Sequence, residues 1–584
     1  MAYKLLIFLA LFSSLFSIEI EDNNEIDEII QIIELDPIDI NRGSELQLLT
    51  IPYISKSDIE DILDYRKSKG KLVVEDLVRL NIVSYQEYET IKDCFKDSNS
   101  NKLLRFRSLV KRPLYKVAGE KKRKFYGNRY KNRYSILLKN EKIDIGALGE
   151  KDSYELQSNY KYNINYNADL FSIGFGNFVL KDRNGVVNEA SLYNNPFEYS
   201  SNIFELKKDL STQEFYDMKG VVIKSDLPYI SFEAGVFETQ FSSTLENGTI
   251  KSVKIDGIYE TENSIKKNFN SKNRRVASTV SIYNRKHRVS LGFIGDNYNR
   301  KFYKSEDKIF NDYSYLLSYK NSMLKNLEGS FTALLKGDKF LGKVNLNHKS
   351  SIVTDLFIQY SNIKKATPFS NDIINLEGKN ELLFGGMIST IKSKWRSWFS
   401  YTAHINSNEN KQSFKQSLER KFGKVKFKIT ALEKIYKKRE IFFNYNTKLT
   451  LSYSERKTSV GSSFQYSKSE EKLSEGIIFN SYIKNRLGKY FDIKFGLVNF
   501  YSTRGKHLFY NSGSYEGKSN SLTSLSGSGY IGYGKIVYNY WGFKISLGYY
   551  NQASSSGVIG SGNNEINGNK DRLSLGIDYI WKEK

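Results

Sequence analysis

The residue types that carry most enzyme chemistry are few and scattered in this sequence. The four histidines have no metal-ligand spacing, and we interpret each as a loop or lumen residue: His287, His348, His404 and His507. Cys94 is the one cysteine, which excludes an internal disulfide and a thiolate metal cluster. Scattered carboxylates could serve a surface hydrolase, but no constellation selects one. The sequence therefore predicts a protein that is not an enzyme, with no catalytic residue, no metal ligand and no cofactor.

Two short motifs match known signatures but are better explained as strand and turn positions. Residues 527–532 fit the glycine spacing of a dinucleotide fingerprint, which requires a strand before it and a helix after it. Residues 533–538 read YGKIVY, however, and continue as a strand. Residues 247–249, NGT, fit a glycosylation acceptor, and we interpret them as a hairpin turn.

The element that would position side chains in this chain is an alternating strand, seen most clearly at 443–454, FNYNTKLTLSYS. Phe443, Tyr445, Leu449 and Tyr453 share one face, because successive side chains of a strand point to opposite sides. Asparagine, lysine and serine dominate the other face. The segment is close to the roughly 9–11 residues that a tilted strand needs to cross a bilayer.

The same alternation recurs after residue 100 and predicts a mainly β fold. It is found in five further segments: Phe171–Phe175, Tyr313–Tyr319, Phe491–Leu497, Phe543–Tyr549 and Leu573–Trp581. The last of these ends in an aromatic residue, as outer-membrane barrels commonly do, although Lys582–Lys584 follow it. We predict a large antiparallel transmembrane β-barrel of about 20–26 strands. A β-solenoid and a set of soluble sandwiches are the alternatives, and no short period supports a solenoid.

The N-terminus predicts export. Residues 5–16 form an apolar run after Lys4, which is the size of a signal-peptide core and too short for a spanning helix. A buried N-terminal helix is the alternative. No later apolar run is long enough to span a membrane as a helix. An exported membrane protein of this kind belongs in the bacterial outer membrane.

Charge is divided unevenly between an acidic head and a basic body. Residues 19–97 contain 20 acidic and 9 basic residues, a net charge of −11. Because the whole chain carries +23 and Lys4 adds +1, about +33 is left for residues 98–584. A basic surface attracts outer-membrane lipid, lipopolysaccharide phosphates, polyanionic solutes or nucleic acid. Solvated loop lysines without a specific partner are the alternative interpretation.

The acidic head shows a doubled helical pattern. A capping box at Ser44–Gln47 predicts a short helix, followed by a tight connection at 51–55 and a longer helix that ends at Gly70. The second unit repeats this order, with a short helix at Glu75–Leu80, a connection at 81–83 and a final helix from Ser84. The repeat predicts a small all-α domain.

Three stretches of this head carry a family resemblance: DPIDINRGSELQLLTIP, DILDYRKSKGKLVVEDL and VRLNIVSYQEYETIK. They resemble the tandem helix-hairpin-helix module of competence DNA receptors and repair proteins. In that family each hairpin usually reads Gly-hydrophobic-Gly and binds DNA phosphates through backbone N–H groups. Here residues 53–55 read YIS and residues 82–84 read IVS, so all four glycines are missing. Five cations are available for phosphate contacts: Lys56, Arg66, Lys67, Lys69 and Lys71. The alternative interpretation is that they form an ordinary solvated helix face.

The whole arrangement resembles a family of helix-hairpin-helix proteins with outer-membrane barrels. We expect a signal peptide at 1–17, an acidic amphipathic helix or linker at 18–35, the helix-hairpin-helix domain at 36–97, a basic linker and first strand at 98–130, and the barrel at 131–584. We predict a non-enzymatic outer-membrane barrel that serves transport, assembly or surface interaction. Its head would lie in the periplasm and bind a periplasmic protein. The alternative hypothesis is a DNA-binding or DNA-uptake surface protein.

Overall fold

The computed structural model describes most of the body and part of the head. It describes the strands and short turns between 103 and 582, together with some of the residues between 38 and 96. The longer stretches outside this description are 1–37, 97–102, 115–127, 154–158, 182–203, 211–215, 254–265, 302–310, 362–380, 512–521 and 560–565. The predicted signal peptide at 1–17 and the acidic segment at 18–35 lie outside the described residues.

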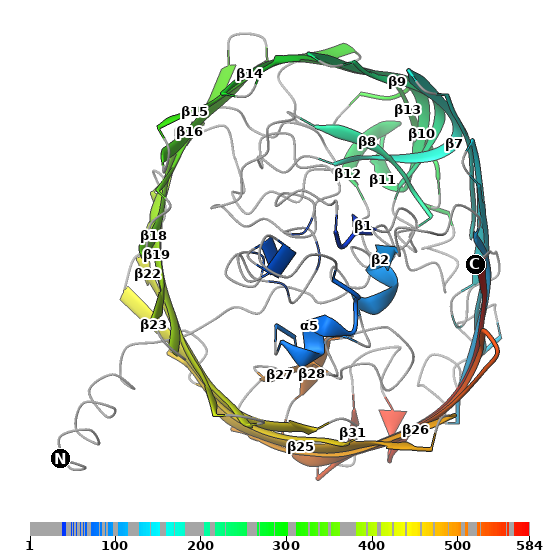
Figure 1. Ribbon diagram of the computed structural model, residues 1–584, viewed down its shortest axis with the longest axis vertical. Coiled ribbons are helices and arrows are strands. Elements are labelled where there is room, and N and C mark those ends of the chain that lie inside the picture. The colour runs from blue at the N-terminus through cyan, green and yellow to red at the C-terminus, as the bar shows by residue number, and fades with distance from the viewer. Residues whose placement is uncertain are drawn as a thin grey trace.

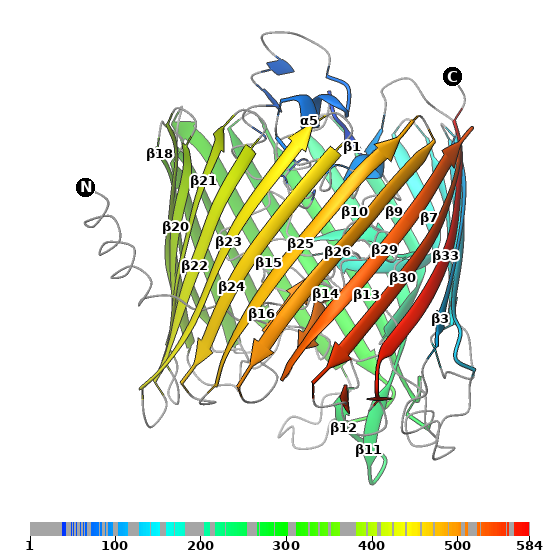
Figure 2. The ribbon, with the colours of Figure 1, turned by 90° about the horizontal axis from the view of Figure 1, so that it is seen from below.

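A closed antiparallel barrel of 24 strands forms the body (Figures 1 and 2). Wall neighbours follow one another along the chain, apart from short strands in the connections, and the last wall strand pairs with the first. The predictions of a mainly β fold and of about 20–26 strands are therefore confirmed. The wall strands are β3 Leu103–Pro113, β4 Lys131–Lys139, β5 Ile143–Lys151, β6 Asn159–Asn167, β7 Phe171–Lys181, β9 Tyr216–Asp226, β10 Ile230–Phe241, β13 Ser271–Tyr283, β14 His287–Tyr298, β15 Asn311–Leu324, β16 Leu327–Lys336, β17 Lys339–His348, β18 Ile352–Ser361, β19 Glu381–Lys392, β20 Trp395–Ile405, β21 Asn410–Phe422, β22 Val425–Lys437, β23 Ile441–Glu455, β24 Thr458–Ser469, β25 Ser474–Leu487, β26 Phe491–Ser502, β29 Ser528–Tyr540, β30 Phe543–Ser554 and β33 Lys570–Lys582.

Side-chain alternation gives the wall an apolar outer face and a polar inner face. On β6, Tyr160 and Tyr166 near the two strand ends are exposed, whereas Lys161 and Asn163 between them are buried inside. The predicted segment at 443–454 lies in β23, where Leu449 and Leu451 are exposed on the outside. An apolar outer band with aromatic residues near both ends is the surface that barrels present to lipid. The protein is thus an outer-membrane β-barrel.

The two ends of the barrel differ in their connections. At one end, which we call the turn end, every connection between wall strands is two or three residues long. At the other end, which we call the loop end, several connections are long and carry extra paired strands (Figure 2). These pairs are β11 Ser243–Glu246 with β12 Thr249–Val253, β27 Leu508–Asn511 with β28 Leu522–Leu525, and β31 Val558–Ile559 with β32 Ile566–Asn567.

Two sequence interpretations are confirmed at the loop end. Asn247 and Gly248 have φ angles of 50° and 76° and form the turn between β11 and β12, as the hairpin interpretation of NGT predicts. The glycine-rich segment at 527–532 leads into β29 rather than a helix. A strand at that place rules out the dinucleotide fingerprint.

The described residues of the head form a small apolar core. Its elements are β1 Ile38–Asp39, which pairs in parallel with β2 Phe95–Lys96, the helix α5 Asp76–Arg79 and the 3-10 helix η1 Lys92–Cys94. Figure 1 places them inside the outline of the ring, and Figure 2 places α5 and β1 at the turn end. The core residues are Ile40, Leu48, Ile51, Ile54, Ile59, Ile62, Leu72, Val74, Leu77, Ile82, Val83, Tyr88, Ile91, Cys94 and Phe95.

Within the described part of the chain, no helix is long and apolar enough to cross a membrane.

The two faces of β23 give a direct test of the wall. Leu449 lies near the middle of the strand and faces outward, so Leu449→Arg places a cation in the hydrocarbon and should cost about 2–4 kcal/mol of folding free energy. Lys448 faces inward, so Lys448→Glu should leave assembly largely intact. Urea unfolding in lipid vesicles measures both variants. Equal damage from the two substitutions would contradict the placement of β23 in the wall.

Candidate functional site in the lumen

A short strand, β8 Glu205–Lys208, lies inside the barrel rather than in its wall (Figure 1). β7 pairs with β6 as far as Gly176 and with β9 as far as Phe178. From Phe178 to Lys181 it pairs with β8. Gly176 has a φ of +116°, where a side chain would be strained, and a Cβ there would collide with the Tyr162 carbonyl. Residues 178–181 and 205–208 thus form a two-stranded ribbon that enters the lumen, which we call the lumen ribbon.

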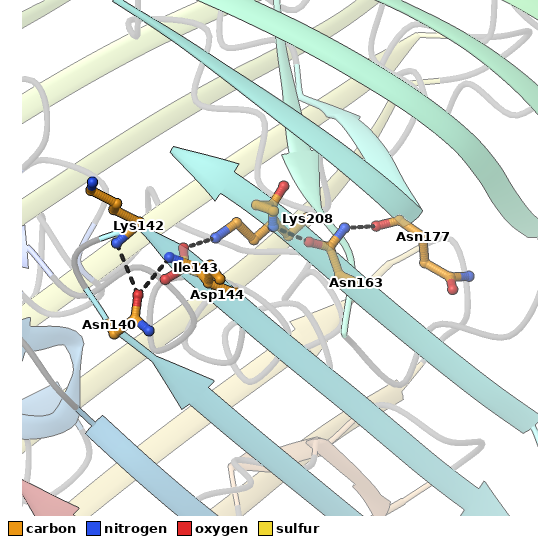
Figure 3. Close-up of polar contacts among 8 residues, drawn as sticks. Asn140, Lys142, Ile143, Asp144, Asn163, Asn177 and Lys208 are labelled. Carbon is orange, nitrogen blue, oxygen red and sulfur yellow. Dashed lines mark hydrogen bonds and ion pairs between the residues drawn. The ribbon is translucent and has the colours of Figure 1, made fainter. Parts of the chain in front are cut away.

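Ion pairs fasten one side of the lumen ribbon to the wall. Lys208 pairs with Asp144 on β5 (Figure 3). The next residue, Asp209, accepts a hydrogen bond from Lys161 Nζ on β6 at 2.6 Å, and both side chains are buried. The Asp209 backbone N–H donates to the Asn177 carbonyl at 2.9 Å. Removing one member of a buried ion pair costs several kcal/mol, so these contacts hold β8 in place.

Two side chains of the wall satisfy the backbone at the open edge of β8. The Leu206 N–H donates to Glu233 Oε2 on β10 at 2.9 Å. Lys224 on β9 pairs with Glu233 and also donates to the Leu206 carbonyl. A buried backbone group without a partner would cost about as much as a lost hydrogen bond. Lys224 and Glu233 therefore supply Leu206 with the two hydrogen bonds that the backbone of a neighbouring strand would otherwise make.

The lumen ribbon packs against an apolar cluster inside the barrel. Phe178 meets Phe237 edge to face, with ring centroids 5.8 Å apart. Beside the cluster, Arg275 and Asp296 form a fully buried pair with two hydrogen bonds of 2.7 and 2.8 Å. Packed side chains thus fill this side of the lumen. The cluster consists of Phe178, Leu180, Phe204, Leu206, Met218, Val222, Phe237, Phe241, Ile250, Ala277, Ile294, Tyr298, Leu316, Leu334, Leu341, Phe357 and Leu383.

The structure describes only one of the five cations predicted to contact phosphate. Arg66 is half-buried, and its Nε donates to the Ile40 carbonyl at 2.7 Å. Burial lowers the pKa of Arg66, and the Asp39 carboxylate opposes that shift. The other four lie outside the described residues: Lys56, Lys67, Lys69 and Lys71. The phosphate-contact prediction is therefore neither confirmed nor refuted.

Sequence reasoning missed the charged residues around the lumen ribbon. Asp144 stands between Ile143 and Ile145, and Lys161 stands between Tyr160 and Tyr162. This alternation would have predicted that both side chains face the lumen. Their partners at 208 and 209 belong to a long connection without such a pattern. Among the described residues no group of three His, Cys, Asp or Glu could hold a metal ion.

No protein-family model and no curated protein matches the chain. Among solved structures it is similar to the siderophore receptor PirA from Acinetobacter baumannii, at 8% identity and a TM-score of 0.44 over 83% of this chain and 81% of that one. It is also similar to a mutant of the ferric enterobactin receptor PfeA from Pseudomonas aeruginosa, at 8% identity and a TM-score of 0.43 over 83% of this chain and 81% of that one. A third similar structure is the FrpB iron transporter from Neisseria meningitidis, at 9% identity and a TM-score of 0.41 over 88% of this chain and 83% of that one. At such TM-scores these similarities carry no argument about the ligand of this chain.

The buried pair at the base of the lumen ribbon can be tested with one substitution. Asp209→Asn leaves the buried Lys161 ammonium without a carboxylate, which should destabilise the ribbon by about 3–5 kcal/mol. Hydrogen exchange should then lose protection at residues 205–209 while β5 and β6 keep theirs. The matched control is Lys161→Met with Asp209→Leu, which removes both charges and should restore much of the protection. Unchanged protection in Asp209→Asn would show that this pair does not hold the ribbon.

Proposed function

We propose that this protein moves a solute across the outer membrane and that its role is not enzymatic. Outer-membrane barrels have short periplasmic turns and longer extracellular loops, which supports assigning the turn end to the periplasm. The head then lies in the periplasm, over the inner mouth of the barrel. The lumen ribbon enters from the extracellular side, because it belongs to the connection between β7 and β9.

The single observation that carries the proposal is that folded segments obstruct a lumen much too wide for wall side chains to fill. Barrels of about 22 strands serve as transporters with a plugged lumen. In this protein the head stands over one mouth, and the ribbon with its apolar cluster occupies part of the interior (Figures 1 and 2). A wide pore that folded segments partly obstruct fits regulated passage better than a purely structural role.

We propose that residues 36–97 fold as a divergent helix-hairpin-helix domain that serves as the cover of the barrel. α5 lies within the short helix predicted at Glu75–Leu80. The hydrophobic residues of both hairpins, Ile54, Ile82 and Val83, are buried in the core of the head. The net charge of −11 over residues 19–97, which include this domain and the acidic segment before it, suits contact with a basic periplasmic protein that displaces the head from the mouth.

No described contact favours the alternative of a DNA-uptake protein. The guanidinium of Arg66, the one described member of the five candidate cations, donates to the Ile40 carbonyl within the head. The net charge of −11 over residues 19–97 also opposes the phosphate attraction that drives non-specific DNA binding.

Unfolding the head should open the pore. Leu77 is fully buried in the core of the head, so Leu77→Asp places an unpaired charge there at a cost of several kcal/mol. We expect planar bilayers that contain this variant to conduct more than bilayers with the wild type. Limited proteolysis reports whether the head has unfolded, and heat-modifiable mobility reports whether the barrel has assembled.

The matched control is Val73→Asp, which adds the same charge at a site that is 53% exposed and should leave conductance unchanged. Wild-type conductance in Leu77→Asp with a protease-sensitive head and an intact barrel would contradict the proposal.

A further inference from the structure

Lysines line the inner face of three adjacent wall strands, β21, β22 and β23. The outward rows of these strands hold pairs such as Phe427 with Leu451 and Ile429 with Leu449. The alternate positions therefore point into the lumen. Among the inward positions whose side chains the structure describes, six hold lysine: Lys411, Lys415, Lys426, Lys428, Lys434 and Lys448. We call these six residues the lysine row.

Strand register places the lysine row along the length of the wall. β22 supplies Lys426, Lys428 and Lys434. Residues that pair across the three strands form one row of side chains. Lys448 on β23 pairs with Thr430, and Lys415 on β21 pairs with Leu432. Lys411 lies opposite Tyr436, nearest the loop end. Each of six successive inward rows thus holds a lysine, with a spacing of about 7 Å along the strand.

Carboxylates do not match these lysines in number. Glu419 is the one acidic residue at an inward position of β21, β22 and β23, whose backbones the structure describes throughout. It pairs with Lys426 at 3.1 Å, at the turn end of the row. The neighbouring inner face of β24 carries serine, glycine and glutamine, which add no charge. The inward positions of β21, β22 and β23 therefore carry more positive than negative charge along the height of the wall.

On the opposite side of the barrel, lysines and arginines that face the lumen form ion pairs that stabilise the fold. There Lys161 pairs with Asp209, Lys208 with Asp144, and Arg275 with Asp296. Each of these cations has a carboxylate within ion-pair distance, and the side chains of Lys161 and Arg275 are fully buried. Lys411 and Lys448 are exposed inside the barrel, and the other four side chains of the lysine row are half-buried. The lysine row is accessible to a solute in the lumen.

We propose that the lysine row binds and guides a small solute that carries several negative charges on phosphate or carboxylate groups. Ammonium groups bind such oxygens as flexible point charges through charge-assisted hydrogen bonds. A series of similar sites lets an anion pass from one cation to the next without being trapped at any of them. The proposal names the substrate class of the transport function and rests on that function.

A binding measurement tests this proposal separately from transport. Full-length protein in detergent is titrated calorimetrically at low salt with tripolyphosphate and, in a second arm, with citrate. We expect both anions to bind, and the affinity to fall as salt screens the charges. Lys428→Gln with Lys448→Gln should weaken binding by about tenfold for each lysine removed. Lumen substitutions of this kind leave the barrel assembled, which heat-modifiable mobility verifies.

The matched control is Lys272→Gln with Lys468→Gln, which removes two exposed lysines from outward positions of β13 and β24. It should bind both anions as the wild type does. The proposal is overturned if the wild type binds neither anion, if the control loses as much affinity as the inward pair, or if a single-stranded oligonucleotide alone binds. Anion binding without any conductance from Leu77→Asp would instead reject transport and retain the anion site.

Discussion

Closure of the ring is the constraint on which the rest of the structure depends. Hydrocarbon offers no hydrogen-bond partners, so every backbone N–H and C=O in the wall must pair with a neighbouring strand. β33 therefore has to meet β3, and it does so in register from Leu103 with Lys582 to Pro113 with Arg572. On the inner face Arg105 holds Asp578 with two hydrogen bonds of 3.1 and 2.8 Å across this seam. Since the chain enters and leaves the wall at the same end, the head and the C-terminus share the turn end.

A ring of this size encloses more space than its own side chains can fill, and the chain treats the two sides of that space differently. On one side the connection between β7 and β9 folds inward, and its charges are matched with those of the wall, as with Lys161 and Asp209. On the other side the lysine row leaves positive charge facing the lumen. One barrel thus combines a packed, charge-balanced half with a cationic half that we assign to the solute.

Period-two alternation explains why so much of the wall could be predicted from the sequence. β7 shows where that pattern ends. Phe171, Ile173 and Phe175 alternate in the wall, but after Gly176 the apolar run at 178–180 is continuous, because those residues are buried on both faces inside the lumen. The position of Asp144 in the lumen follows from its apolar neighbours, whereas its pairing with Lys208 depends on the path of a long connection. No local pattern determines such a path. In the head, helical spacing predicted α5, and four of the five candidate phosphate contacts lie outside the described residues.

The most direct test of the account is a disulfide across the seam between β3 and β33. Val110 and Leu575 are opposite each other on the outer face, at a Cα separation of about 4.5–5.5 Å that a disulfide can bridge. In a chain whose Cys94 is replaced by alanine, Val110→Cys with Leu575→Cys should cross-link in the outer membrane, as shown by altered mobility of the unreduced, denatured protein. Val110→Cys with Leu573→Cys is displaced by two residues and should not cross-link. Absence of the first cross-link, or equal cross-linking of both pairs, would contradict a closed barrel with this register.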